Sequence, residues 1–150
     1  MIKKRGKQGQ LHLSFGVIFS IILIIVFLGF GFYAITKFIQ LQEGIQTEKF
    51  MRDFQDDIDA MWKSSQGSQI KSYVLPKKVT AVCFTDDENE LWNFVFQSKQ
   101  IIQGKNIENI ALDNILAQEN PYCILNVKGK VNLKLSKEFG ETRVMVEREE

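Results

Sequence analysis

The pattern of apolar and polar residues divides the chain into three parts. Residues 15–35, FGVIFSIILIIVFLGFGFYAI, contain no charged side chain. Residues 37–63 place apolar side chains three or four positions apart, which is the period of one helix face. From residue 79 onward, apolar and polar residues alternate over short runs, as they do in strands. The pattern therefore predicts a long helix followed by a sheet.

The apolar segment has the length of a membrane span. Its 21 residues would form a helix of about 31 Å, close to the hydrocarbon thickness of a bilayer. A buried helix of a soluble protein would normally keep a polar face over this length, but Ser20 is the only hydroxyl between Gly16 and Phe32. We therefore expect a transmembrane helix at residues 11–36, with a hydrophobic core helix as the alternative.

The charges on either side of the segment predict its orientation. Four basic residues and no acidic one precede it, namely Lys3, Lys4, Arg5 and Lys7. The charges just after it nearly cancel, so the positive-inside rule keeps residues 1–10 in the cytoplasm as a basic leader. The rest of the chain after the span would lie outside the cytoplasm. The apolar core of a secretory signal is usually 7 to 15 residues long, and this segment is longer.

The second segment, residues 37–65, is expected to continue the helix outside the membrane. Its apolar stripe is predicted to pack on the sheet and consists of Phe50, Met51, Phe54, Ile58, Met61 and Trp62. The charged face opposite, which includes Asp53, Asp56 and Asp59, is typical of solvent exposure. No proline occurs in residues 1–75, so one helix is expected from about Leu11 to Lys63. The polar run SSQGSQ would end it.

Residues 66–150 are expected to form a β-rich domain outside the cytoplasm. Residues 79–85 and 91–97 alternate and are separated by the polar run DDENE, which predicts a hairpin. Pairing across that loop gives the opposite pairs Phe84 and Trp92, Val82 and Phe94, and Thr80 and Phe96. Residues 106–121 favour a short helix that ends before Pro121, with an extended segment as the alternative.

The alternation in residues 122–136 leaves two structures open, one long strand or a hairpin that turns at residues 128–130. Its apolar side would be formed by Cys123, Leu125, Val127, Val131, Leu133 and Leu135. Residues 142–147 are expected to form the last strand. The predicted fold class is α+β, with a long N-terminal helix, transmembrane and then amphipathic, packed on a small antiparallel β-sheet domain.

The N-terminal arrangement resembles a known family. A short basic leader, a Gly-Gln step at Gly9 and Gln10, an apolar helix that continues as an amphipathic one, and a C-terminal β-domain are together similar to archaeal type IV pilin-like proteins with a class III, prepilin-type signal. Similarity at the level of motifs is confined to about residues 3–35. The resemblance implies a structural subunit of a cell-surface filament or secretion apparatus, pilin-like or pseudopilin-like, that assembles through its N-terminal helix.

The resemblance also implies a processing site and a set of partners. A prepilin-type peptidase would cut between Gly9 and Gln10, and loss of four basic residues would change the formal charge from +1 to −3. Ser14 would occupy the fifth mature position, where many pilins carry a glutamate. The helix would contact membrane lipid, and the chain would associate with itself or with other pilin-like subunits. An uncleaved signal anchor, whose outer α+β domain binds a ligand or another membrane protein, is the alternative.

Few residues point to catalysis or to a cofactor. The single histidine, His12, lies beside the span, so no histidine-based triad is expected in the outer domain, and we expect neither an enzyme nor a metal site. Cys83 and Cys123 are the two cysteines, and they are either bridged or buried as thiols. Lys128, Lys130 and Lys134 would follow one side of a strand. We interpret them as edge lysines on a solvated face rather than as a nucleic-acid site.

Overall fold

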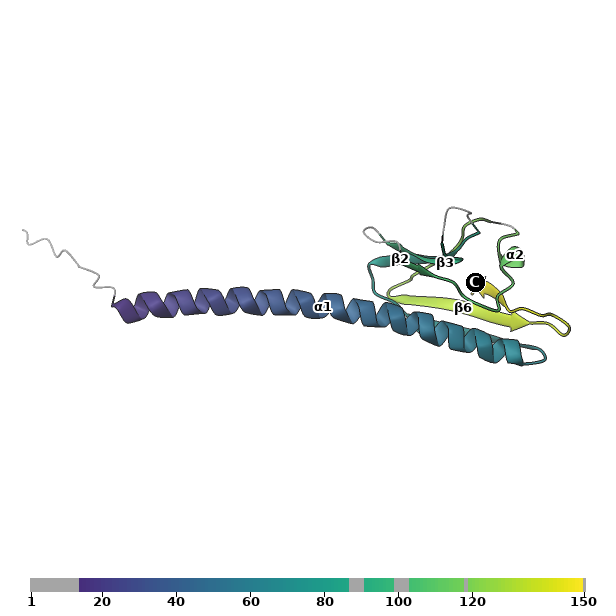
Figure 1. Ribbon diagram of the computed structural model, residues 1–150, viewed down its shortest axis with the longest axis horizontal. Helices are drawn as coiled ribbons and strands as arrows, with labels where there is room; N and C mark the ends of the chain where they lie inside the picture. Colours follow the sequence, from purple (N-terminus) through teal and green to yellow (C-terminus); the bar gives the residue numbers. More distant parts are fainter. Residues whose placement is uncertain (1–13, 87–90, 99–102, 118, 150) are drawn as a thin grey trace, which may run out of the picture. The chain divides into compact units, whose positions relative to one another are not determined.

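The computed structural model describes residues 14–86, 91–98, 103–117 and 119–149. The chain forms two compact units, residues 1–40 and 41–150, and the boundary falls within helix α1, Phe15–Lys63. The first unit contributes the helix residues up to Gln40, and the second contains all the strands (Figure 1). The predicted α+β class, a long N-terminal helix with antiparallel sheets, is confirmed.

Helix α1 begins and ends at polar residues. Ser14 precedes it, and the Ser14 carbonyl accepts a hydrogen bond from the Val17 backbone N–H at 2.8 Å. Serine is favoured at this position because its side-chain oxygen can accept a hydrogen bond from a backbone N–H of the first turn. The expected start near Leu11 lies outside the described residues. The helix ends at Lys63, as predicted, and the Ser64 side chain donates to the Met61 carbonyl at 2.6 Å.

Within the described residues of the second unit, seven strands form two antiparallel sheets. The three-stranded sheet has the order β1-β6-β7 and consists of β1 (Gly67–Val74), β6 (Lys130–Lys137) and β7 (Met145–Arg148). The four-stranded sheet has the order β4-β3-β2-β5 and consists of β4 (Gln103–Lys105), β3 (Phe94–Ser98), β2 (Val79–Phe84) and β5 (Tyr122–Leu125). A short helix, α2 (Leu112–Ile115), lies within the segment where a helix was predicted.

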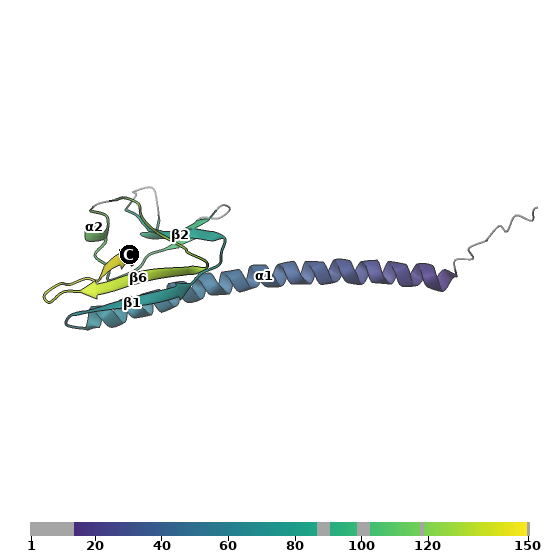
Figure 2. The ribbon, with the colours of Figure 1, turned by 180° about the vertical axis from the view of Figure 1, so that it is seen from behind.

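The predicted stripe of α1 forms the centre of the core. Phe50, Met51, Phe54, Ile58 and Met61 are buried, whereas Trp62 is half exposed and donates from its indole N–H to the Thr142 carbonyl at 3.0 Å. The stripe joins the inner faces of both sheets, because the Phe54 ring contacts Tyr73 on β1 and Phe84 on β2. Figure 2 shows β1 and β6 beside this part of α1.

The predicted register of the first hairpin is wrong by two residues. Phe84 pairs with Phe94 and Val82 pairs with Phe96, so the loop between β2 and β3 is longer than DDENE. The connection lengthens because Asn93 takes part in the loop. Its backbone carbonyl accepts from the Thr85 N–H at 3.1 Å, and its side chain bonds the Ile107 backbone. Trp92 therefore lies outside the strand, and its ring lies against Gly104 of β4 instead of opposite Phe84.

Neither structure left open for residues 122–136 is observed. The chain turns at Lys128 and Gly129, but β5 pairs with β2 and β6 pairs with β1 and β7, so the two strands enter different sheets. The apolar side predicted for the whole segment holds only for β6, where Val131, Leu133 and Leu135 are buried. On β5 it is Ile124 that enters the core, and Leu125 and Val127 are exposed.

Strand β1 was not predicted, because its apolar residues do not mark the buried face. Ile70 and Val74 are exposed. Tyr73 is buried and Lys71 is half-buried, and both face α1. Both inward side chains bind Asp57 of α1, with Lys71 Nζ donating at 2.9 Å and the Tyr73 hydroxyl at 2.8 Å. The polar face of α1 is therefore only partly solvated. Asp59 is also used, since it accepts from the Asn109 side chain at 3.0 Å.

Burial of Tyr73, together with its hydrogen bond to the Asp57 carboxylate and the charge of that group, raises the pKa of the phenol well above its usual range. The hydroxyl therefore remains a neutral donor at ordinary pH. A raised pKa in the folded state means that this contact stabilises the fold fully below about pH 10 and less as the pH rises further.

Candidate functional site

The apolar part of α1 is the first candidate functional element. An 18-residue stretch of the helix has a mean hydropathy of 2.8 with none of it buried, so by length and composition α1 can cross a membrane. Two hydroxyl groups in this region are satisfied within the helix, because Ser20 donates to the Gly16 carbonyl and Thr36 to the Tyr33 carbonyl, each at 2.8 Å. These two groups need no partner outside the helix, which suits the interior of a bilayer, where no water is available to bond them. The segment is compatible with a membrane anchor.

Two glycines leave the surface of this segment open. A Cβ added at Gly29 or at Gly31 would meet no atom within 4 Å. Large apolar side chains around them, such as Phe27, Phe30 and Phe32, are exposed in the first unit. Small residues between large ones allow another helix to approach closely in a bilayer. This part of α1 is therefore able to pack against other helices.

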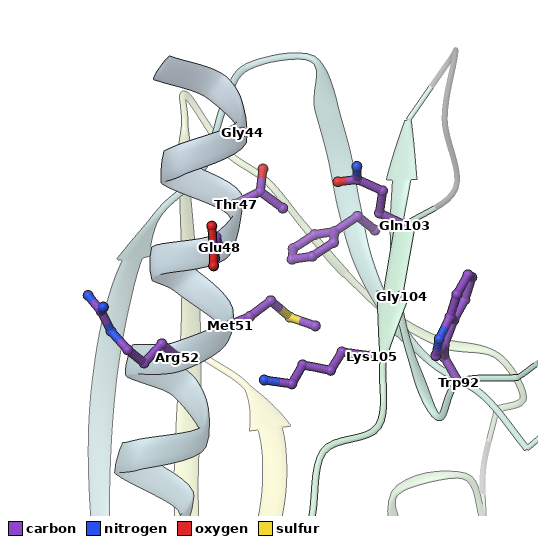
Figure 3. A pocket seen from close by; sticks show the side chains of 10 residues that line it. Gly44, Thr47, Glu48, Met51, Arg52, Trp92, Gln103, Gly104 and Lys105 are labelled. Carbon is purple, nitrogen blue, oxygen red and sulfur yellow. The ribbon is translucent and has the colours of Figure 1, made fainter. Parts of the chain in front are cut away.

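The second candidate is a groove within residues 41–150. It has a volume of about 700 Å³ and lies between α1 and the edge strand β4 (Figure 3). Its apolar floor includes Met51 and Phe96, which are buried. Polar groups on the two sides come from Thr47, Glu48 and Arg52 on α1 and from Gln103 and Lys105 on β4. Opposite charges around an apolar floor suit a polar ligand or a peptide segment.

One wall of the groove depends on a close contact between Trp92 and Gly104. A Cβ at Gly104 would lie 2.6 Å from Cε3 of the Trp92 ring and 2.8 Å from the Phe94 carbonyl oxygen. Only glycine lets the indole lie against the β4 backbone at this distance. Sequence reasoning missed the groove because its two sides are more than 50 residues apart in the chain, and neither carries a local motif.

We predict that Gly104→Ala lowers the free energy of unfolding by about 1–3 kcal/mol, because either the Trp92 ring or the β3 backbone must move. Gly44→Ala is the matched control, since Gly44 lines the same groove but a Cβ there meets no atom within 4 Å. In a helix this change should instead stabilise the protein by about 0.5–1 kcal/mol. Denaturant unfolding in detergent would check both, and equal stability of the two variants would contradict the contact.

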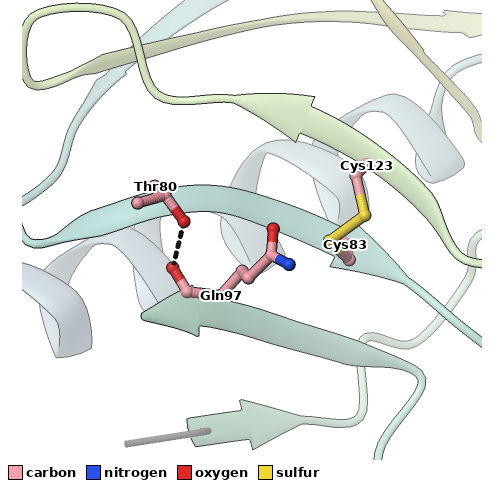
Figure 4. The surroundings of a disulfide bond; sticks show 4 residues. All are labelled: Thr80, Cys83, Gln97 and Cys123. Carbon is pink, nitrogen blue, oxygen red and sulfur yellow. Dashed lines mark hydrogen bonds between the residues drawn. A yellow bond between two sulfur atoms is a disulfide. The ribbon is translucent and has the colours of Figure 1, made fainter. Parts of the chain in front are cut away.

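The two cysteines meet across neighbouring strands. Cys83 on β2 and Cys123 on β5 form a disulfide, 40 residues apart in sequence (Figure 4). They are paired in the register of the four-stranded sheet, on the face opposite the main core, where Ala81 and Val95 are also buried. In the same sheet the Thr80 hydroxyl donates to the Gln97 carbonyl at 3.0 Å, at the point where the β2–β3 register shifts. The bridge holds edge strand β5 to β2.

The remaining predictions from sequence concern the processing site, the three lysines and a metal site. Gly9, Gln10 and His12 lie outside the described residues, so the processing site remains a prediction. The prediction of edge lysines is wrong, because Lys130 and Lys134 lie on β6, the central strand of its sheet, and Lys128 lies in the turn before it. Lys134 is solvated as expected and pairs with Glu147 at 3.0 Å. Within the ranges that the structure describes, no group of three or more His, Cys, Asp or Glu side chains could hold a metal ion.

The apolar segment, the groove and the disulfide are thus the features on which a function can be built. The apolar segment has the clearest chemistry, because it is long, uncharged and exposed. Comparison of the chain with protein-family models, with curated proteins and with solved structures finds no match.

Proposed function

We propose that the protein is a single-pass, membrane-anchored structural subunit of pilin type. The observation that carries the proposal is helix α1, which runs without interruption from an exposed, uncharged segment into the residues that form the core of the β-domain. A subunit that assembles through its N-terminal helix needs both properties. The apolar half must be free to exchange lipid for neighbouring helices, and the other half must hold a folded domain.

The chemistry of the apolar half supports assembly in a bilayer. The hydroxyls of Ser20 and Thr36 bond backbone carbonyls of the same helix, so these two groups are paired before a neighbour arrives. The open surfaces at Gly29 and Gly31 allow close packing of helices, which in lipid depends on van der Waals contact. In this proposal the chain rests in the membrane with its β-domain outside the cytoplasm and then enters a filament or pseudopilus through the helix.

The first test is the N-terminus of the protein isolated from its own membranes. Prepilin-type processing should give a chain that begins at Gln10 and lacks the mass of residues 1–9, as read by intact mass and N-terminal sequencing. Gly9→Leu should block processing, because the peptidase requires a small residue before the cut in the family that the leader resembles. Gly6→Leu is the control and should be processed normally. A native chain that begins at Met1 would overturn the pilin assignment.

The groove favours a second candidate function, that of an uncleaved single-pass protein whose outer domain binds a ligand or another membrane protein. Its apolar floor and charged sides are features of a binding site rather than of a filament core. This function predicts an intact N-terminus and a membrane partner that is captured by crosslinking. Loss of that capture in the Lys105→Glu variant would support it, with Lys63→Glu as the control outside the groove.

A further inference from the structure

Two tight turns lie side by side in the second unit. The first, residues 76–79, joins β1 to β2, and the second, residues 127–130, joins β5 to β6. We call them the paired turns. The Leu75 N–H donates to the Gly129 carbonyl at 3.0 Å, and the Asn126 side chain donates to the Pro76 and Val79 carbonyls at 3.1 and 2.7 Å. These bonds hold two segments 50 residues apart as one surface.

The paired turns are strongly basic in an acidic unit. Four of their eight residues are exposed lysines, and none is acidic; the lysines are Lys77, Lys78, Lys128 and Lys130. All 18 acidic residues of the chain fall within 41–150. Of the 19 basic residues, 5 lie in residues 1–40 and 14 lie in residues 41–150, so the second unit has a formal charge of −4. Four lysines close together in a unit of net negative charge create a local positive potential.

The backbone at Lys128 shows that one of these charges is held in an unfavourable conformation. Lys128 has φ of 55° and Gly129 has φ of 86°, the left-handed pair that a two-residue turn requires. Glycine suits the second position, but asparagine, aspartate or glycine would suit the first better than lysine. A residue kept in a strained backbone conformation points to a use for its side chain.

Apolar side chains flank the lysines. Val127 is 61% exposed and pairs with Lys130 across the turn, and Val74 is 59% exposed and lies opposite Lys130 in the β1–β6 register. Exposed valines among lysines match the interface of a bilayer, where amines meet anionic headgroups and apolar groups enter between them. A surface that binds only a polyanion in water gains little from exposed valines.

The length of the chain limits how far Glu43, the partner of one turn lysine, can lie from the apolar segment. Lys78 forms an ion pair with Glu43 of α1, and seven residues separate Glu43 from Ile35, the end of the apolar segment. Even if fully extended, that connection would reach only about 28 Å. The covalent chain therefore cannot carry Glu43, or the lysine paired with it, farther than this from the end of the apolar segment.

From these observations we propose that the paired turns bind the anionic lipid headgroups of the membrane in which the chain is anchored. The inference rests on the membrane anchoring proposed above. Lys77, Lys128 and Lys130 supply the charge, Val74 and Val127 enter the headgroup layer, and Glu43 holds Lys78 in place. Binding would keep the β-domain against the membrane before assembly, and release of the turns would free it.

The test is amine labelling of the full chain in lipid nanodiscs. One set of discs contains phosphatidylcholine alone, and the other an equimolar mixture with phosphatidylglycerol. Acetylation by an N-hydroxysuccinimide ester, read by mass spectrometry, should be about fivefold slower at Lys77, Lys128 and Lys130 in the anionic discs, the preference expected for a lysine near a charged surface. Lys63 and Lys105, which are exposed elsewhere, should react equally in both. About 1 M salt should remove the difference.

Two variants separate lipid binding from structure. Lys128→Asn should raise Tm, because asparagine accepts the left-handed conformation, and should at the same time reduce the protection of Lys130. Adding Lys77→Gln should reduce that protection further, and the Lys63→Gln/Lys105→Gln variant should leave it unchanged. A purely structural role for Lys128 would not give greater stability together with lost protection.

The failures of the two proposals give different results. If the full chain does not float with phosphatidylcholine vesicles, the membrane anchor itself is wrong. If it floats but the turn lysines react equally in both kinds of disc, only the lipid-binding inference is overturned. Protection of the same lysines by short duplex DNA, with no effect of anionic lipid, would overturn it as well and assign the surface to nucleic acid.

Discussion

Phe54→Ala is expected to lower the free energy of unfolding by about 3–5 kcal/mol, the range for deleting a fully buried phenylalanine. Phe54 has no exposed surface, and its ring contacts Tyr73, Phe84 and Phe94 at centroid distances of 5.7, 6.3 and 5.6 Å. These rings belong to both sheets, so the cavity would open where α1 joins them. Neighbouring strands cannot close it without losing their own pairing.

Denaturant unfolding of the full chain in detergent, followed by near-UV circular dichroism, would measure this loss. Leu41→Ala is the matched control, because Leu41 lies on the same helix in the same unit and is 62% exposed. It should change stability by less than about 0.5 kcal/mol, as surface substitutions do. Similar effects of the two substitutions would show that α1 does not form the core of the β-domain.

The part of the fold that depends on helical period could be predicted from sequence. Phe50, Phe54, Ile58 and Met61 recur at steps of three or four, and a residue on such a stripe can avoid water only by facing the rest of the domain. The end of the helix at Lys63 also followed from local residues. In both cases the information lies within a few turns of one element.

The sheets could be predicted only in part, because alternation shows two faces but does not show which strand is the neighbour. The runs around Val82 and Phe96 were identified as strands that share an aromatic face, and that face is buried. Their register failed because Asn93 bonds Ile107, a contact 14 residues away that no local pattern reveals. Strand β1 escaped prediction because Lys71, rather than Ile70, faces the helix.

The candidate sites differ in the same way. The apolar segment was evident from sequence because its signal is continuous over 21 residues. The groove and the paired turns combine residues from distant segments, such as Met51 with Gly104 and Lys77 with Lys128. Lys128 and Lys130 were noticed, but as part of a strand face. The backbone bond between Leu75 and Gly129 and the bonds of the Asn126 side chain to the first turn place Lys77 and Lys78 beside them.

Removal of the disulfide is the second large effect we expect. The Cys83→Ala/Cys123→Ala variant should be less stable to unfolding than the oxidised protein by about 4 kcal/mol, the chain-entropy value for a loop of 40 residues. Alanine is a suitable replacement, because Cys83 is buried beside Ala81 and both cysteines are used in this one disulfide. Denaturant midpoints with and without dithiothreitol would measure the effect.

Reductant should lower the midpoint of the native protein to that of the double variant, and the double variant, which has no bridge to break, should be unaffected. No change of the native midpoint with reductant would mean that the bridge does not constrain the unfolded chain. The loss should be largest for the connection between β2 and β5, since β5 is an edge strand held by one neighbour. Hydrogen exchange at Ile124 would show whether β5 opens first.

The state of the same two thiols in native membranes tests the orientation of the chain. A structural disulfide forms and persists outside the cytoplasm, whereas cytosolic thiols are kept reduced. Cells treated with an alkylating agent before lysis should therefore give a protein that carries no label on Cys83 or Cys123, and that takes two labels after reduction. Full alkylation without reduction would place the β-domain in the cytoplasm. That result would reverse the orientation inferred from the basic leader, even if α1 spans the membrane.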